Sequence, residues 1–236
     1  PEAVIHLAGL SHIGDSWSRP GRYFQVNVLG TENLLKAAAG VRLVVASSAA
    51  VYGEVPEEEQ PIPERRLPAP QSPYAWTKAA MERLALFQGA VVARCFNITG
   101  AGQATTFALP AFAAQLAAIR RDGLAPVLRV GNLAARRDFL HVDDAVEGYR
   151  LLLEGAEAGT VYNLGSGEAV SIEHALERLI AISGLRVEVE IDESKFRPVD
   201  LPLLRADIER LRGLGWSPAR SLEEALRDLW QAAAPS

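Results

Sequence analysis

The chain has 236 residues, of which 49% are hydrophobic and 22% are charged, and its formal net charge is −5. This composition is typical of a globular chain and lacks the basic excess that binds nucleic acid or an anionic membrane. No apolar stretch is long enough to cross a bilayer, and no charged-then-apolar leader opens the sequence, so neither a membrane-spanning nor an exported protein is expected. Cys95 is the only cysteine, which excludes an internal disulfide and favours a cytoplasmic location.

Hydrophobic periodicity predicts alternating strands and helices along the chain. Strands are expected at 3–7, 41–47, 89–96, 127–130, 161–164 and 186–191, and helices at 23–39, 73–87, 107–121, 143–154, 171–183, 207–212 and 222–233. Ser221 and Glu224 form a capping box at the start of the last helix. The alternation indicates an α/β fold, in which helices cover both faces of a parallel sheet. The length suggests one or two domains.

A serine, a tyrosine and a lysine carry the main chemical signal. Ser48 follows the β-branched strand expected at 41–47, and ligands of open α/β sheets bind at the carboxyl ends of strands. In a helix over 73–87, Tyr74 and Lys78 project from one face, so the ammonium lies beside the phenol. A neighbouring cation lowers the pKa of a phenol from its reference value of about 10. The pattern predicts Tyr74 as a general acid/base, although such a pair on its own is more often a solvated helix face.

These residues belong to a longer set of motifs through which the chain resembles the extended short-chain dehydrogenase/reductase family, the NAD-dependent epimerases, dehydratases and reductases of nucleotide sugars. The motifs are His6–Gly9, Asn27–Thr31, Ser47–Gly53, Tyr74 with Lys78, Arg94–Asn97 and Arg137–Val142. The resemblance implies a doubly wound, Rossmann-type parallel sheet in residues 1–100. It implies a smaller substrate-binding α/β domain in 101–236, with segments that return to the first sheet.

The family begins with a strand and a Gly-x-x-Gly-x-x-Gly turn that holds the cofactor pyrophosphate. Nothing in this sequence matches that turn, and residues 3–7 resemble the family's fourth strand. The resemblance therefore implies an N-terminally incomplete Rossmann domain, with about two or three βα units of roughly 30 residues each upstream. A non-catalytic nucleotide-sugar-binding remnant is an alternative, which the intact Ser48, Tyr74 and Lys78 oppose.

The resemblance also assigns roles to individual residues. It implies Ser48, Tyr74 and Lys78 as catalytic residues, and NAD or NADP as the cofactor. The implied cofactor contacts are Leu7, Ala8, Gly9, Asn27, Ser47, Tyr74 and Lys78. The implied contacts to a nucleotide-sugar substrate, with GDP expected as the nucleotide, are His12, Ser48, Asn97, Arg137, Arg197 and Asp200.

For some of these residues a purely structural role is an alternative to substrate binding. Arg137 and Arg197 are expected to grip the diphosphate, because a guanidinium offers a bidentate fork. Asp200 is expected near the nucleoside, or equally as a turn residue after a proline, and His12 as a substrate contact or as an exposed loop residue. The proline-rich segment 56–73 is interpreted as an active-site loop because Ser48 and Tyr74 flank it. No histidine spacing indicates a metal site.

A homodimer is implied as well, since relatives commonly pair through the helices expected at 23–39 and 73–87. The apolar stripes of these helices could equally belong to the core, which is the default interpretation. They consist of Leu34, Leu35, Ala38, Met81 and Leu84.

Within the family, the segment Val130–Phe139 in combination with Ser11–Trp17 and Arg197–Asp200 is most similar to the reductases of GDP-4-keto-6-deoxy-mannose. A GDP-mannose 4,6-dehydratase would need an added carboxylate just before Tyr52, where the sequence has Ala49 and Ala50, and an alanine cannot move a proton. A reductase needs only the serine, tyrosine and lysine already described. An NAD-dependent 4-epimerase needs the same three residues and stays the alternative, and the sequence leaves the choice between NADH and NADPH open.

Overall fold

The computed structural model describes residues 1–196 and 200–234. One of its sheets contains four strands that are all parallel. Their order is β1 (Ala3–His6), β2 (Arg42–Ser48), β3 (Val91–Cys95) and β7 (Val161–Leu164). β7 comes from the second half of the sequence and returns to pair with β3, so this sheet joins distant parts of the chain.

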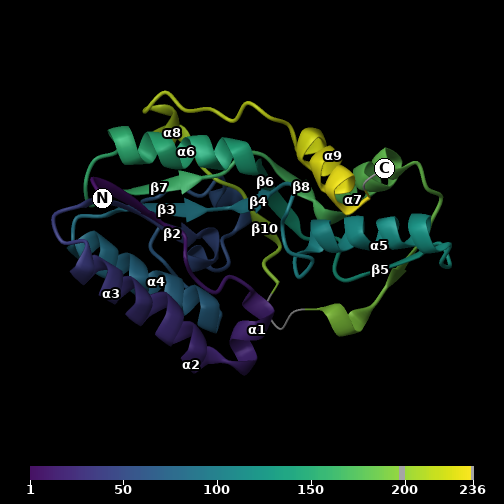
Figure 1. The fold of residues 1–236 in the computed structure, drawn as a ribbon, viewed down its shortest axis with the longest axis horizontal. Helices are drawn as coiled ribbons and strands as arrows, with labels where there is room; N and C mark the ends of the chain where they lie inside the picture. The colour runs from purple at the N-terminus through teal and green to yellow at the C-terminus, as the bar shows by residue number, and fades with distance from the viewer. Residues whose placement is uncertain (197–199, 235–236) are drawn as a thin grey trace.

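Helices cover both faces of this sheet (Figure 1), with α3 (Gly30–Ala37) and α4 (Pro73–Phe87) on one face and α6 (Val142–Gly155) on the other. Successive side chains of a strand point to opposite faces. Val45 of β2 accordingly packs in the core with α3 and α4, and Val44 packs in the core that includes α6. The middle of β2 is buried on both sides, which fits the continuous apolar run Leu43–Ala46. The predicted α/β fold with a parallel sheet between helices is confirmed.

A second group of elements lies beside this sheet in Figure 1. It contains a four-stranded sheet, in which β6 pairs with β10 and β4 and also antiparallel with β8, and a two-stranded sheet of β5 and β9. Helices α5, α7 and α9 pack against one another around a separate hydrophobic core. The bounds are β4 (Asn97–Thr99), α5 (Ala108–Asp122), β5 (Val127–Val130), β6 (Arg136–His141), β8 (Ala169–Ser171), α7 (Ile172–Ser183), β9 (Glu188–Ile191), β10 (Leu203–Leu204) and α9 (Leu222–Ala233).

Short helical elements connect these layers. They are α1 (Ile13–Ser18), α2 (Pro20–Tyr23), the π-helical η1 (Phe24–Leu29), the 3₁₀ elements η2 (Ala49–Tyr52), η3 (Glu57–Glu59) and η4 (Glu193–Lys195), and α8 (Glu209–Arg212). The predicted single helix at 23–39 was wrong in detail, because η1 interrupts it between α2 and α3. The predicted capping box of α9 is confirmed, since the Ser221 and Glu224 side chains each bond the other residue's backbone N–H.

The interpretation of residues 56–73 as an active-site loop was wrong. None of these residues lines the large cavity described below. Ile62 is fully buried in the main core, and its backbone pairs with the segment before α8. Asn163 of β7 donates from its amide to the Ile62 carbonyl at 2.8 Å. The segment therefore braces the sheet, and its prolines suit a fixed, irregular path.

The apolar stripes of α3 and α4 belong to the core, which was the default interpretation. Leu35, Ala38 and Met81 are buried in one cluster, with Leu34 and Leu84 packed against it. Within the described ranges, no helix combines the length and apolar character needed to cross a membrane. The division into domains at residue 100 stays a prediction.

Candidate active site

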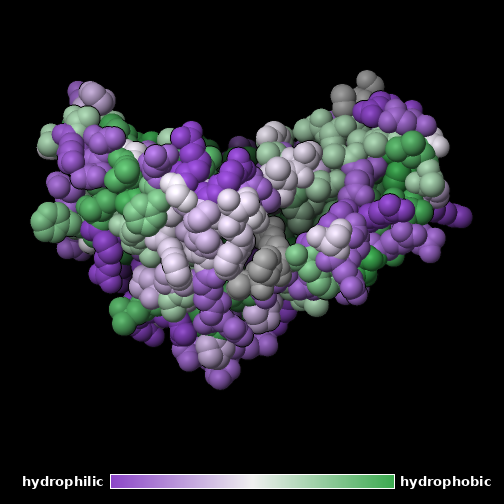
Figure 2. Space-filling view, turned by 90° about the horizontal axis from the view of Figure 1, so that it is seen from below, coloured by the Kyte–Doolittle hydropathy of each residue, from purple (hydrophilic) through white to green (hydrophobic). Residues whose placement is uncertain are grey.

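A cavity of ≈ 1050 Å³ opens at the carboxyl ends of β2 and β3, between the first sheet and the elements around α5 and β6. The space-filling view from below shows the surface notched between two lobes (Figure 2). Ser48, Tyr74 and Asn97 line the cavity from the side of the first sheet, and Arg137 and Asp200 line it from the other side. The structure therefore brings together residues that lie up to 152 positions apart in the sequence, from Ser48 to Asp200.

Local structure places Ser48 and Tyr74 at the cavity wall. Ser48 ends β2 and caps η2, where its Oγ accepts a hydrogen bond from the Ala50 N–H at 3.2 Å. Ser72 caps α4 in the same way, so Tyr74 stands in the first turn of the helix, with 6% of its surface exposed. Burial raises the pKa of Tyr74 to about 12, and a hydrogen bond with Ser48 acts in the opposite direction. Tyr74 is therefore protonated at neutral pH and suited to donate a proton.

Lys78 lies one turn further along α4 and is 6% exposed. Its Nζ donates to the Ala46 carbonyl at 2.9 Å and lies 6.0 Å from the centre of the Tyr74 ring. The prediction that Lys78 lowers the pKa of Tyr74 was wrong for this structure, because desolvation of the phenol dominates. Burial also lowers the pKa of Lys78 itself, against the raising influence of Cys95 and Glu82.

The predicted cofactor contacts gather at the end of β1. Leu7, Ala8 and Gly9 are exposed there. A Cβ on Gly9 would lie 3.0 Å from Asn27 Oδ1 and 3.6 Å from Lys78 Nζ, so this bare backbone stands beside the ammonium. An ammonium carries three N–H donors, and Ala46 accepts one of them. This donor set fits the ribose hydroxyls of a nicotinamide nucleotide.

Asn27 and Ser47 have contacts within the chain that the sequence did not reveal. The Asn27 side chain is 1% exposed, accepts from the Leu10 N–H at 2.8 Å and donates to the Leu10 carbonyl at 3.0 Å, so it holds the loop after β1. Asn27 lies in η1, and π-helical turns are frequent at functional sites. Ser47 Oγ donates to a carboxylate oxygen of Glu82 at 2.5 Å, although Ser47 also borders the cavity.

The predicted substrate contacts Arg137 and Asp200 form an ion pair at 2.7 Å in the cavity wall. The second carboxylate oxygen of Asp200 accepts a hydrogen bond from the Asn132 amide at 2.7 Å. Asp200 therefore orients a guanidinium and an amide that both line the cavity. Arg197 lies outside the described residues, and its predicted role stays a prediction.

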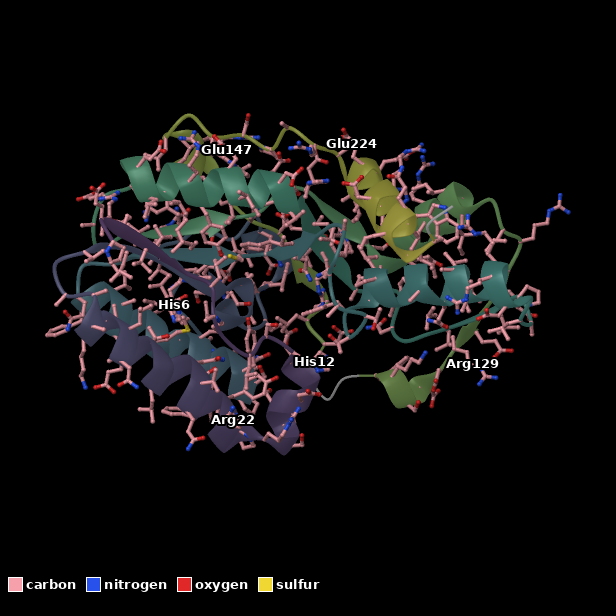
Figure 3. All side chains as sticks on the ribbon, in the orientation of Figure 1. His6, His12, Arg22, Arg129, Glu147 and Glu224 are labelled. Carbon is pink, nitrogen blue, oxygen red and sulfur yellow. The ribbon has the colours of Figure 1, made fainter. Side chains whose placement is uncertain are left out.

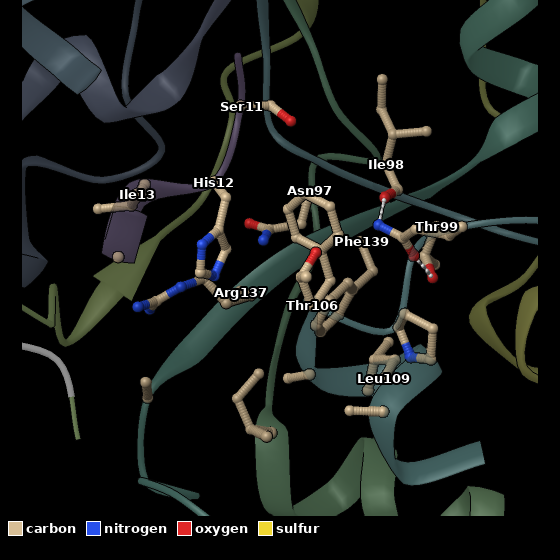
Figure 4. Close-up of a pocket in the computed structure, with 18 of the residues that line it drawn as sticks. Ser11, His12, Ile13, Asn97, Ile98, Thr99, Thr106, Leu109, Arg137 and Phe139 are labelled. Atoms are coloured by element: carbon tan, nitrogen blue, oxygen red, sulfur yellow. Dashed lines mark hydrogen bonds between the residues drawn. The ribbon is translucent and has the colours of Figure 1, made fainter. Parts of the chain in front are cut away.

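His12 and Asn97 also line the cavity (Figure 4). His12 caps α1, with Nδ1 accepting from the Asp15 N–H at 3.3 Å, and its ring meets the edge of Phe107 with 6.3 Å between centres. Figure 3 shows His12 beside α1 and well separated from His6. His6 is hydrogen-bonded with Thr31 Oγ1 at 2.9 Å and has a structural role. Among the described residues, no cluster of three or more His, Cys, Asp or Glu could hold a metal ion.

Sequence reasoning missed several residues that shape the cavity. Asn132, Phe107 and Phe139 line it, and Asn132 lies 68 positions from its partner Asp200. Such long-range pairs leave no local periodicity. The one signal for Asn132 was its place in the segment Val130–Phe139, which was singled out as a whole.

Cys95 ends β3 at the cavity and its Sγ lies 2.8 Å from the Tyr149 hydroxyl. Burial raises the pKa of the Cys95 thiol to about 11. The thiol is therefore protonated at neutral pH, and the thiolate is the form that acts as a nucleophile. Covalent catalysis by Cys95 is not expected.

Comparison with known proteins places this site in a family. A family model described as GDP-mannose 4,6 dehydratase matches residues 1–229, which is nearly the whole chain. The chain belongs to the GDP-mannose 4,6 dehydratase family. A GDP-6-deoxy-D-mannose reductase from Pseudomonas aeruginosa is 38% identical over 239 residues, which cover 96% of this chain and 78% of the relative.

Two solved structures extend the likeness to the whole fold. The structure of RMD from Pseudomonas aeruginosa complexed with NADPH gives a TM-score of 0.93 at 37% identity, covering 99% of this chain and 81% of that one. UDP-glucose 4-epimerase from Thermus thermophilus in complex with NAD gives 0.88 at 32% identity, covering 99% and 78%. The family model confirms the predicted epimerase/dehydratase family. The two solved structures confirm the predicted Rossmann-type fold. The relatives together confirm the prediction of an NAD(P)-dependent enzyme that acts on nucleotide sugars.

Proposed function

We propose that the protein reduces the C4 ketone of GDP-4-keto-6-deoxy-mannose, with NADH or NADPH as reductant and Tyr74 as proton donor. The observation that carries the proposal is the chemistry of the cavity wall, where Ser48 and Tyr74 stand together without a neighbouring carboxylate. Asp200 is the one carboxylate among the described residues that line the cavity, and it is engaged by Arg137 and Asn132. Reduction of a ketone needs one proton donor, which Tyr74 supplies.

The described side chains suit that reaction. The Ser48 and Tyr74 hydroxyls hold the ketone oxygen, and a reduced nicotinamide, when bound, supplies the hydride to C4. Negative charge then grows on the oxygen, where the Tyr74 phenol donates its proton. The pKa of Tyr74, raised by burial to about 12, keeps that proton in place until an alkoxide forms. Lys78 is placed to hold the ribose hydroxyls.

The same wall argues against dehydration, the activity for which the family is named. Removal of water across C5 and C6 needs an additional acid/base beside the C4 machinery. Ala49 and Ala50 line the cavity at the positions where the family resemblance places that carboxylate. A methyl group cannot exchange a proton, so a reductase fits these positions better than a dehydratase.

An assay with defined sugar nucleotides tests this proposal. The full-length protein is expected to oxidise NADH or NADPH when given GDP-4-keto-6-deoxy-mannose and to leave GDP-mannose unchanged. Absorbance at 340 nm measures the first activity, and chromatography of the nucleotide sugars measures the second. Conversion of GDP-mannose to its 4-keto-6-deoxy product would contradict the reductase assignment. Interconversion of UDP-glucose and UDP-galactose without net oxidation would instead support the epimerase alternative. That alternative is tested because two relatives at 32% identity are UDP-glucose 4-epimerases.

Arg137 is proposed to bind the substrate diphosphate, together with Arg197. Arg137→Ala should weaken binding of GDP-mannose, used as an unreactive ligand, by about 1.5–3 kcal/mol, the range for a charge-assisted hydrogen bond. That corresponds to roughly 10-fold or more in Kd by titration calorimetry. Arg136→Ala is the matched control, because Arg136 points to Glu57 on the surface and does not line the cavity. Equal affinity of the two variants would remove Arg137 from the diphosphate site.

We also propose a homodimer that pairs through the side of the molecule formed by η1 and α4. Four large apolar side chains are exposed there: Phe24 (49%), Leu29 (46%), Trp76 (61%) and Phe87 (88%). Figure 2 shows green residues interspersed with purple ones on the left, where α3 and α4 run in Figure 1. Sedimentation velocity should give a dimer for the wild type and a monomer for Phe24→Glu/Trp76→Glu. A wild-type monomer at micromolar concentration would contradict the proposal.

We place this reaction in the cytoplasm. The single thiol of Cys95, which has no second cysteine to pair with, suits a reducing compartment.

A further inference from the structure

Helix α4 presents three polar side chains at steps of four residues, Tyr74, Lys78 and Glu82, which places them along one face. The proposed reaction uses the first two. Glu82 is 2% exposed and is paired with Arg94 of β3, which is 4% exposed. Arg94 Nε donates to Oε1 at 3.0 Å and Nη2 donates to Oε2 at 2.9 Å, so the pair is bidentate. Such buried, charge-assisted pairs hold a fixed geometry.

Ser47 links this ion pair to β2. Its Oγ donates to Glu82 Oε1 at 2.5 Å, and Ser47 directly precedes Ser48 in the strand. One residue earlier, the Ala46 carbonyl accepts a hydrogen bond from Lys78 Nζ at 2.9 Å. Helix α4 is therefore joined to the end of β2 by two successive contacts, at Ala46 and at Ser47, the two residues that directly precede Ser48.

Arg94 extends the same network toward the other side of Ser48. Its Nη1 donates to the Glu64 carbonyl at 3.2 Å, and its guanidinium lies 4.7 Å from the centre of the Tyr52 ring. Tyr52 closes η2, the turn that Ser48 caps. One buried guanidinium thus contacts the segment after Ser48 and, through Glu82, the helix that carries Tyr74.

We infer that Ser47, Glu82 and Arg94 are positioning residues that fix the distance between Ser48 and Tyr74. The kinetic part of this inference rests on the proposed reductase function. Sliding α4 along β2 would break charge-assisted hydrogen bonds between buried groups. A buried polar group that loses its hydrogen-bond partner reduces the stability of the folded state. A displacement of about 1 Å at a reacting group can cost on the order of 10²-fold in rate.

Ser47→Ala in the full-length protein tests the inference, because it removes one of the two contacts between α4 and the end of β2 while the Glu82–Arg94 pair stays intact. We expect kcat to fall by about 10- to 100-fold, with KM for the sugar nucleotide and Kd for NADPH unchanged. Ser47→Thr keeps the hydroxyl donor and should restore kcat. Amide hydrogen exchange should become faster over residues 74–82 and stay unchanged in α9, which serves as the internal control.

Two results would overturn the inference. One is a Ser47→Ala protein with wild-type kcat and wild-type exchange over residues 74–82. The other is weaker NADPH binding with unchanged kcat, which would make Ser47 a cofactor contact. If the wild type reduced no nucleotide-linked ketone, the proposed function would fail, and the exchange comparison alone would decide whether Ser47 fastens α4.

Discussion

Tyr74→Phe is expected to lower kcat by about 10²–10⁴-fold, because proton transfer by a positioned side chain contributes that factor. The substitution removes one oxygen and keeps the ring, which packs edge-to-face on Tyr23 with 6.4 Å between centres. KM should change much less than kcat, because proton transfer occurs only in the transition state while Ser48 still holds the ketone oxygen. Steady-state kinetics with GDP-4-keto-6-deoxy-mannose measure both constants.

Tyr162→Phe is the matched control for this variant. Tyr162 is 4% exposed and belongs to β7, and its hydroxyl accepts from the Glu157 N–H away from the cavity. Tyr162→Phe also removes one buried hydroxyl, but kcat should stay within a factor of about 3 of the wild-type value. A hydrogen bond far from the cavity contributes to stability and not to proton transfer. A Tyr74→Phe enzyme that kept more than about a tenth of wild-type turnover would contradict the proton-donor role.

The pH dependence of kcat/KM is a second test of Tyr74 as the proton donor. The folded pKa of Tyr74, about 12, lies above the ordinary value of 10.0, so folding favours the protonated phenol. The stability this contributes is complete below about pH 10 and is lost as the pH rises through about 12. The donor form accordingly persists across neutral pH. We expect kcat/KM to show no fall that depends on the Tyr74 phenol below about pH 10.

Asp138→Ala is expected to reduce the free energy of unfolding by about 3–5 kcal/mol. The Asp138 side chain is fully buried in β6 and accepts from the Ser166 N–H at 2.6 Å, the Ser166 Oγ at 2.7 Å, and the Gly167 and Ala206 N–H groups at 3.0 Å. Removing the carboxylate leaves these donors without a partner, and each such buried group costs about 1–3 kcal/mol. Urea unfolding followed by circular dichroism measures the change.

Asp143→Ala provides the comparison for Asp138. Asp143 lies in the first turn of α6 with a side chain that is 57% exposed, and it pairs with Arg220 at 3.1 Å on the surface. An exposed ion pair contributes about 0–1 kcal/mol, so this variant should unfold near the wild-type midpoint. Similar losses in the two variants would mean that the Asp138 network does not hold β6 to its neighbours.

The sequence predicted the elements that have a clear hydrophobic pattern and missed those that do not. β2 and β3 contain the apolar runs Leu43–Ala46 and Val91–Ala93, and helix 73–87 was predicted with the bounds that α4 has. β6 was missed because it begins with Arg136, Arg137 and Asp138, charged residues that a strand tolerates here only through specific partners. The missed strands β4, β8 and β10 have three residues or fewer, too short for any periodicity.

For the candidate site, too, the sequence predicted the residues that a local pattern places and missed the long-range pairs. Ser48, Tyr74 and Lys78 were accessible to sequence reasoning because a strand end and a helical spacing place them. The pairs Ser47–Glu82 and Asn132–Asp200 join residues 35 and 68 positions apart, which no local pattern connects. The sign of the Tyr74 pKa shift was mispredicted for a related reason. A spacing reveals a neighbouring cation, whereas the degree of burial that dominates the shift depends on the whole fold.

Deuterium transfer tests reduction at C4 most directly. The full-length protein is incubated with GDP-4-keto-6-deoxy-mannose and nicotinamide cofactor deuterated at the hydride-donating position of its ring. We predict a product with one deuterium at C4 of the sugar by NMR and mass spectrometry, and a parallel loss of this product in the Tyr74→Phe variant. A C4 position that carries hydrogen from the starting sugar or from solvent would contradict hydride delivery to the ketone.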